Sequence, residues 1–213
     1  MSDEETGSWW QQVTGEAIQG ELKGQKLESV FDDELSFGVW RRENPGGRIL
    51  RPDEKILQAK EYAPADWETR MRKTPVATSK AYGNTLEPRI LVAGIKINGE
   101  SKAYPVPALE KQSPIIDTLG GRDIVVVLGE DKSSIRAFES VVDGRNLELL
   151  MKPDASPLQL MDPETGSVWD FTGKAVSGEL AGKQLTEIAV LKDYWFDWKG
   201  YNPETRVYGL GDR

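Results

Sequence analysis

Glu5-Thr6-Gly7-Ser8-Trp9-Trp10 is written twice in this chain, and the second copy reads Glu164-Thr165-Gly166-Ser167-Val168-Trp169. The match runs on to Leu27 and Leu185, and with one residue dropped beside Phe171, thirteen of the 22 aligned positions are identical. It continues at a constant offset, with Trp40, Asn44, Pro45 and Arg48 opposite Trp198, Asn202, Pro203 and Arg206. Self-similarity of this kind is typical of an internal repeat, so we expect both copies to adopt the same fold.

The repeat also predicts how the chain is divided. The copies lie about 158 residues apart, which favours two related units. Some 75 residues, from Pro88 to Pro163, precede the second copy, whereas only four precede the first. We therefore expect residues 1–50 to form the C-terminal part of a first repeat unit and residues 88–213 to form a complete second unit. Residues 51–87 have no repeat partner and are expected to form a helical connector.

Strand signals dominate the second unit. Ile90 to Ile97 and Glu100 to Tyr104 flank Asn98-Gly99, the two-residue turn most typical of a β-hairpin. The apolar run from Ile124 to Leu128 has the length of one strand and is expected to be buried on both faces. Lys96 and Lys102 fall on the polar alternation of the hairpin and are expected to face solvent.

Short helices are expected between the strands. Apolar spacing and charge predict one helix over residues 33–43, capped by Asp32, and a second over residues 193–199. Asp53 to Tyr62 also has a helical pattern, and Asp66 precedes a further short helix. Together these signals predict an α+β, β-dominated fold of antiparallel meander sheets or barrel-like units with short helices, internally duplicated.

Composition excludes several functions. The chain has 27 basic and 35 acidic residues, and a net charge of −8 disfavours nucleic acid as a partner. It has neither cysteine nor histidine, which excludes thiolate chemistry, thiolate zinc sites and histidine acid–base catalysis. We expect no cofactor and no membrane span, and because no signal peptide is recognisable, a cytoplasmic location is the default expectation.

Several motifs resemble the prokaryotic family known as domain of unknown function 3179. They are Val92 to Glu100 with Ala103-Tyr104-Pro105, Asp117 to Gly121, both Glu-Thr-Gly-Ser-x-Trp blocks and the endings at Trp40 and Trp198. The resemblance covers residues 1–50 and 88–213, and it implies kinship of fold without an assigned activity. Members of that family typically carry two cysteines after the apolar strand, where this chain has Gly129 to Ser134. The resemblance therefore implies a noncatalytic unit.

Five residues are the candidate ligand or partner contacts. Glu5 and Glu164 adjoin Thr-Gly-Ser, which suits either an oxygen-ligand cation site or a β-turn whose side chains bond the local backbone. Trp9 and Trp10 are adjacent, so only one of them can easily reach a core in a strand. Trp10 and its match Trp169 are the core candidates, and Trp9 is the candidate exposed ring. No residue set suggests a catalytic or metal-binding role.

The leading hypothesis is a soluble, noncatalytic protein-interaction or self-association module. Its partner would be a second copy of the chain or another protein, because a first unit without its own leading strands leaves apolar surface uncovered. One alternative is a carbohydrate-binding module or a carboxylate-based glycoside hydrolase that uses exposed tryptophans. Another is a divalent-cation site at the Glu-Thr-Gly-Ser turns.

Overall fold

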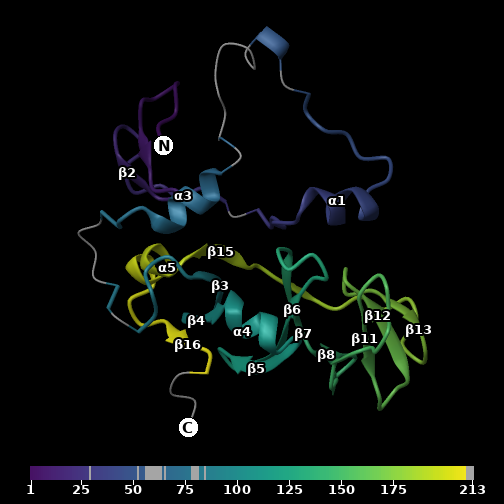
Figure 1. Ribbon diagram of the computed structural model, residues 1–213. Coiled ribbons are helices and arrows are strands. Elements are labelled where there is room, and N and C mark those ends of the chain that lie inside the picture. The colour runs from purple at the N-terminus through teal and green to yellow at the C-terminus, as the bar shows by residue number, and fades with distance from the viewer. Residues whose placement is uncertain are drawn as a thin grey trace. The chain divides into compact units, whose positions relative to one another are not determined.

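The computed structural model describes residues 1–28, 30–51, 53–55, 64, 66–77, 82–83 and 85–209 (Figure 1). These residues form two compact units, Met1–Asp33 and Glu34–Arg213. The three-part division expected from the sequence stays a prediction, and most of the helix expected between Asp53 and Tyr62 lies outside the described residues. None of the helices in the described ranges has the length and hydropathy needed to cross a membrane.

The first unit is built on a two-stranded antiparallel sheet. Strands β1 (Trp9–Trp10) and β2 (Ala17–Gln19) pair Trp10 with Ala17 and Trp9 with Gln19, and the register shifts between the two tryptophans. Adjacent strand residues face opposite sides, so Trp10 is buried with its partner Ala17, whereas Trp9 is exposed.

The second unit contains three four-stranded sheets and one two-stranded sheet. The first has the order β15-β3-β4-β16, formed by Leu191–Tyr194, Leu91–Ile97, Glu100–Pro105 and Arg206–Val207. The second has the order β14-β7-β6-β5, formed by Glu187–Ile188, Ile135–Glu139, Arg122–Leu128 and Ile115–Leu119. The third has the order β10-β11-β12-β13, formed by Leu150–Met151, Gln159–Asp162, Ser167–Asp170 and Ala175–Ser177. Strands β8 (Val141–Val142) and β9 (Arg145–Asn146) pair with each other.

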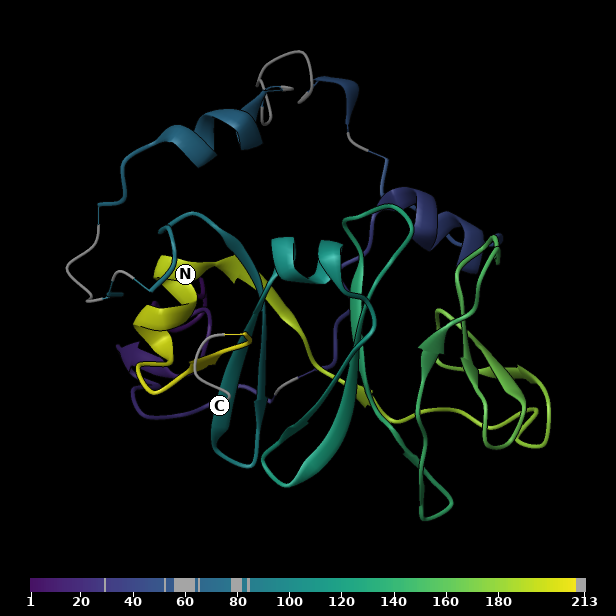
Figure 2. The same cartoon turned by 60° about the horizontal axis from the view of Figure 1, so that its bottom comes forward.

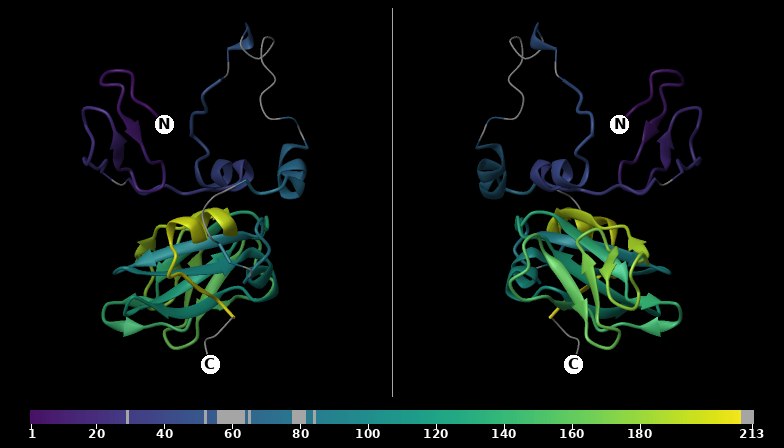
Figure 3. Two further views of the ribbon diagram at one scale, coloured as in Figure 1. Left: turned by 90° about the vertical axis from the view of Figure 1, so that its left-hand side faces the viewer. Right: turned by 90° about the vertical axis from the view of Figure 1, so that its right-hand side faces the viewer.

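Four short helices accompany these sheets in the described residues: α1 (Phe37–Glu43), α3 (Trp67–Lys73), α4 (Val106–Lys111) and α5 (Trp195–Tyr201). Helix α4 contacts β3, β4 and β6, so it sits where two of the sheets meet (Figure 2). Helix α5, yellow in Figure 3, lies on the outside of the β15-β3-β4-β16 sheet. The predicted β-dominated α+β fold is confirmed, and none of the described sheets closes into a barrel.

Two local predictions are confirmed in detail. Asn98 and Gly99 both have positive φ, at 50° and 87°, as the tight turn between β3 and β4 requires. In the apolar run of β6, Val125 and Val127 point into one core with Phe138, while Ile124, Val126 and Leu128 point into another with Ile95 and Leu109. The run is therefore buried on both faces, because a sheet or helix packs against each side.

The helix predicted over residues 33–43 begins later than expected. Helix α1 starts at Phe37, and its cap is Ser36, whose hydroxyl accepts from the Val39 N–H at 3.3 Å. Asp32 is therefore not the cap. The helix predicted over residues 193–199 likewise begins at Trp195, because Asp193 and Tyr194 complete strand β15 against β3.

Candidate functional site

The Thr-Gly-Ser turn of the first copy is held by an aspartate that the sequence analysis overlooked. Asp3 Oδ1 accepts from the Thr6 N–H at 2.6 Å, and the Thr6 hydroxyl lies 2.7 Å from the Ser8 hydroxyl. Ser8 Oγ then accepts from the Leu22 N–H at 3.1 Å, which ties the turn to the far end of the hairpin. The Thr6 backbone bond, followed by the Trp10 indole N–H, lowers the pKa of Asp3 to about 2.

The second copy makes the same bonds at the matching positions. Asp162 Oδ2 accepts from the Thr165 hydroxyl at 2.5 Å, and the Thr165 hydroxyl donates to Ser167 Oγ at 2.7 Å. Ser167 Oγ accepts from the Leu180 N–H at 3.0 Å. The register of the hairpin also shifts in the same place, between Val168 and Trp169. Asp3 and Asp162 are themselves a matched pair, two residues before the repeated block, and this was the signal that could have revealed them.

The candidate contacts are divided by burial. Glu5 and Glu164 are exposed in their turns, and Asp3 and Asp162 rather than these glutamates make the bonds described above. Within the described parts of the chain no three acidic side chains gather as a set of metal ligands. Trp10 and Trp169 are buried, so of the three candidate rings only Trp9 presents a face to solvent, with 54% of its surface exposed.

Matched positions of the two copies differ sharply in exposure. Leu27 is 46% exposed, whereas its counterpart Leu185 is 1% exposed; Phe37 is 57% exposed, whereas its counterpart Trp195 is fully buried. Two further pairs behave in the same way. We call the four exposed side chains of the first copy the uncovered set: Leu27, Val30, Phe37 and Ile49, opposite the buried Leu185, Ile188, Trp195 and Val207.

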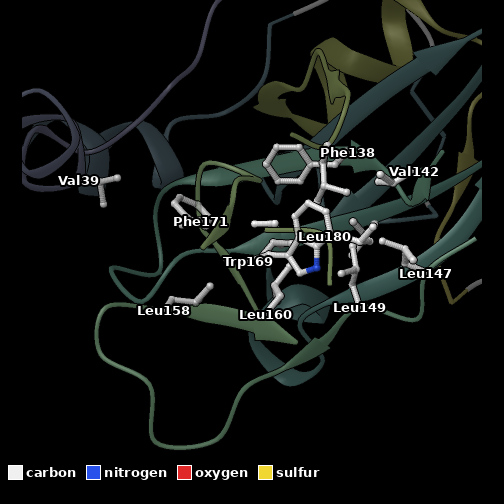
Figure 4. Packing of buried hydrophobic residues seen from close by; sticks show 14 residues of the cluster. Val39, Phe138, Val142, Leu147, Leu149, Leu158, Leu160, Trp169, Phe171 and Leu180 are labelled. Carbon is white, nitrogen blue, oxygen red and sulfur yellow. The ribbon is translucent and has the colours of Figure 1, made fainter. Parts of the chain in front are cut away.

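The counterparts show what normally covers such positions. Leu185 packs in the core around Trp169, which Figure 4 shows beside Leu180 and Phe138. Ile188 lies on β14 beside Ala137 of β7, and it packs in the cluster that contains Ile95 and Leu109. The remaining two share another cluster.

That other cluster lies between α5 and its sheet. Trp195 and Val207 pack with Val92 and Ala103, which belong to β3 and β4. All four counterparts are therefore buried by residues of β3, β4, β6 or β7, or by strands attached to them. In the first copy, the four matching side chains are 46% to 82% exposed.

Helix α1 nonetheless has the same ending as α5. The Asn44 amide donates to the Trp40 carbonyl at 3.0 Å, and the Asn202 amide donates to the Trp198 carbonyl at 3.2 Å. In α1, however, the Trp40 ring stacks on Phe37 with ring centroids 5.8 Å apart, on the outside of the helix. The two helices thus share the C-terminal hydrogen bond that their common sequence provides. They differ in whether other side chains pack over their aromatic residues.

On its other side, helix α1 is fixed to strand β7 and to the core of its own unit. Both amino nitrogens of Arg136, on β7, donate to the Glu43 carboxylate at 2.8 Å, and Nη1 also donates to the Phe171 carbonyl at 3.1 Å. Val39 packs into the core around Trp169. The aromatic pair on α1 is therefore carried by an anchored helix.

One residue expected at the surface lies inside. Lys102 was predicted to face solvent, but it is only 2% exposed, with its Nζ 2.9 Å from Asp117 Oδ2. The same oxygen accepts from the Tyr104 hydroxyl at 2.8 Å. That prediction is wrong because the alternation of β4 carries Lys102 and Tyr104 to the face that packs on β5, where Asp117 compensates the charge.

A hollow of about 450 Å³ opens elsewhere in the second unit, lined by residues of β15, α3, α4 and the turn between β6 and β7. Asp193 of β15 lies in its wall. Burial raises the pKa of the Asp193 carboxyl to about 6; the Tyr194 N–H opposes this rise, and the charges of Asp197 and Glu34 add to it. The turn that contributes Lys132 to the wall is the segment in which this chain departs from the two-cysteine pattern of the family it resembles.

Comparison with protein families identifies the family of the chain. A family model described as protein of unknown function, DUF3179, matches residues 1–205, and the chain belongs to that family. A search of curated proteins and a search of solved structures gave no match.

Proposed function

We propose that this protein is a noncatalytic interaction module that associates through its first repeat copy, residues 1–50, and that its first partner is a second copy of the chain. The observation that supports this is the uncovered set. The same positions in the second copy are buried by strands, so their exposure in the first copy reflects missing cover rather than a polar sequence. Trp9, exposed on β1, adds an aromatic ring to the same copy.

The expected affinity follows from the exposed area. Complete burial of an aliphatic or phenylalanine side chain is worth about 1.5 to 3 kcal/mol. Since the four side chains of the uncovered set are 46% to 82% exposed, covering them contributes about 4 to 7 kcal/mol in total. Association costs about 4 kcal/mol or more in lost freedom of motion. A dimer covers two such sets, worth about 8 to 14 kcal/mol together. After an association cost of about 4 to 7 kcal/mol, a net gain of about 4 to 7 kcal/mol remains, so we expect weak, concentration-dependent association with a Kd of about 10 μM to 1 mM.

Sedimentation velocity between about 5 and 500 μM tests this proposal. The unsubstituted chain should gain mass as its concentration rises, and Leu27→Asp and Phe37→Asp should each remain monomeric, because a charge at the contact must be desolvated. Ile18→Asp is the matched control, since Ile18 and its counterpart Val176 are exposed in both copies and need no cover. A strictly monomeric unsubstituted chain at 500 μM would refute self-association, and equal effects of all three substitutions would remove the role of the uncovered set.

Carbohydrate binding is the alternative function, and it depends on exposed aromatic rings. Of the repeated tryptophans, Trp10, Trp169 and Trp198 are buried, and Trp40 is half-buried. The two exposed tryptophans, Trp9 and Trp67, have no tryptophan counterpart in the other copy. A repeated sugar platform therefore has little support, and the interaction module is the better proposal.

A further inference from the structure

The hollow beside Asp193 is built by segments that are far apart in the sequence. Its size is within the range of small-molecule sites in proteins. Helix α3, which forms one wall, is tied to the body of the second unit by Arg89, whose Nε donates to the Thr74 carbonyl at 2.6 Å. The Arg89 guanidinium also lies over the rings of Tyr194 and Phe196, 5.3 and 5.2 Å from their centroids. The wall is therefore fixed by specific contacts.

The charges in the hollow are not all satisfied by one another. Lys192 is occupied, because its Nζ lies 2.6 Å from Glu34 Oε1 and donates to the Ser133 carbonyl at 3.3 Å. Asp193 accepts a hydrogen bond from the Tyr194 N–H at 2.7 Å but forms no ion pair within the described ranges of the chain. The surroundings of this carboxylate therefore favour a cation supplied from outside.

Two basic side chains in the same wall are also without an acidic partner. Arg72 of α3 and Lys132 of the β6–β7 turn both line the hollow, and neither forms an ion pair with another described residue. The hollow thus offers the half-buried carboxylate of Asp193 and two basic side chains without an ion-pair partner among the described residues, together with the carboxylates of Glu68 and Glu110. A ligand that carries both a positive and a negative group complements this arrangement better than a ligand of a single charge.

Four of the remaining wall residues are apolar or aromatic, and the other two, Glu68 and Glu110, are acidic. Trp67 is 43% exposed, and it lines the hollow with Tyr194, Leu91 and Val106. Apolar and aromatic side chains beside charged groups suit a small amphipathic molecule, which can contact both. They favour a ligand with an apolar portion over a wholly polar one.

We propose that this hollow binds a small zwitterion, an α-amino acid with an aromatic or apolar side chain, whose ammonium group pairs with Asp193 and whose carboxylate pairs with Arg72 and Lys132. The apolar side chain then lies against Trp67 and Tyr194. This inference is independent of the interaction module, because none of these residues belongs to the first copy's uncovered set.

The raised pKa of Asp193 gives the binding a pH dependence. The charged groups near its carboxyl are Glu34, Glu68, Arg72, Glu110, Lys132, Lys192 and Asp197. Both charges of a free amino acid persist between about pH 5 and 7.5, so a change of affinity in this range reports on the protein. With a pKa of about 6, about one tenth of Asp193 is ionised at pH 5, and we expect roughly tenfold weaker binding there than at pH 7.5.

Isothermal titration calorimetry of the full chain with L-phenylalanine tests the proposal. Phenethylamine, which lacks the carboxylate, and 3-phenylpropionate, which lacks the ammonium group, should each bind at least about tenfold more weakly. Asp193→Asn and Arg72→Met should each weaken phenylalanine binding about tenfold or more, and Asp193→Asn should also abolish the pH dependence. Asp197→Asn is the matched control, because Asp197 lies outside the lining, and it should bind phenylalanine normally at pH 7.5.

Three outcomes would overturn the proposal: no heat of binding at 10 mM phenylalanine, equal affinity for phenethylamine, or unchanged affinity in Asp193→Asn. Circular dichroism melts of each variant show whether it is folded. Asp193→Asn should melt no lower than the unsubstituted chain at pH 7.5, since it removes a half-buried negative charge. A loss of binding in that variant therefore reports on the site rather than on folding.

Discussion

Leu185→Ala and Leu27→Ala are the same substitution at matching positions of the two copies. We predict that they lower the free energy of unfolding by very different amounts. Leu185 is 1% exposed and packs in the core around Trp169. Removal of its side chain beyond Cβ loses burial and leaves a cavity, which costs about 2 to 5 kcal/mol in buried leucines. Leu27 is 46% exposed, so its substitution should cost less than about 0.5 kcal/mol in the monomer.

Urea unfolding followed by tryptophan fluorescence measures both costs. Trp169 lies in the same core as Leu185 and reports on its unfolding. With a urea dependence of about 2 kcal/mol per M, a loss of 3 kcal/mol lowers the midpoint by about 1.5 M, whereas Leu27→Ala should shift it by less than about 0.3 M. The titration is run at about 1 μM protein, well below the expected Kd, so that association does not contribute.

Equal midpoint shifts for the two variants at 1 μM would refute the reasoning, because Leu27 would then be as well packed as Leu185. A small shift for Leu185→Ala would refute it from the other side. In that case burial in the second copy would not reflect a cohesive core, and the contrast between copies would lose its energetic meaning.

Three further perturbations are decided by local geometry. Gly94→Ala places a Cβ 2.4 Å from ring atoms of Trp198, so thermal unfolding should show a loss of about 2 kcal/mol or more. Arg136→Met leaves the Glu43 carboxylate without its two hydrogen bonds and should cost about 3 kcal/mol in urea titration. Burial opposes the low pKa of Asp131, about 2, but serine hydroxyl and amide bonds outweigh it. Asp131 therefore adds stability above about pH 4 that is lost as the pH falls through 2, and Asp131→Asn should flatten the pH profile of the melting temperature in that range.

The sequence predicted those parts of the fold that are set by nearby residues. The turn at Asn98-Gly99 could be predicted because the required positive φ angles belong to those two residues. The double burial of Ile124 to Leu128 followed from an uninterrupted apolar run. The shared bonding of the Thr-Gly-Ser turns followed from the repeat, although the aspartates that anchor them stand just before the aligned block.

Features that depend on distant partners could not be predicted in this way. Lys102 reads as a solvent-facing strand residue until Asp117, on a later strand, is placed opposite it. The start of α1 was predicted too early because acidic residues before Ser36 resemble a helix start. The hollow beside Asp193 brings together α3, α4, β15 and a turn, which no local pattern connects.

The same hairpin is stabilised by different interactions in the two copies. This difference favours a docking role for the first copy. The Trp10 indole donates to Asp3 Oδ2 at 2.8 Å, whereas the buried Trp169 indole has no hydrogen-bond partner among the described residues and is held by the core around it. A local hydrogen-bond network thus stabilises the hairpin in the first copy, whereas packing in a core stabilises it in the second. A hairpin that is ordered before it meets a partner loses little conformational entropy on binding. The hairpin of the first copy can therefore present its exposed Leu27 without first becoming ordered, and weak burial energy is enough to produce association.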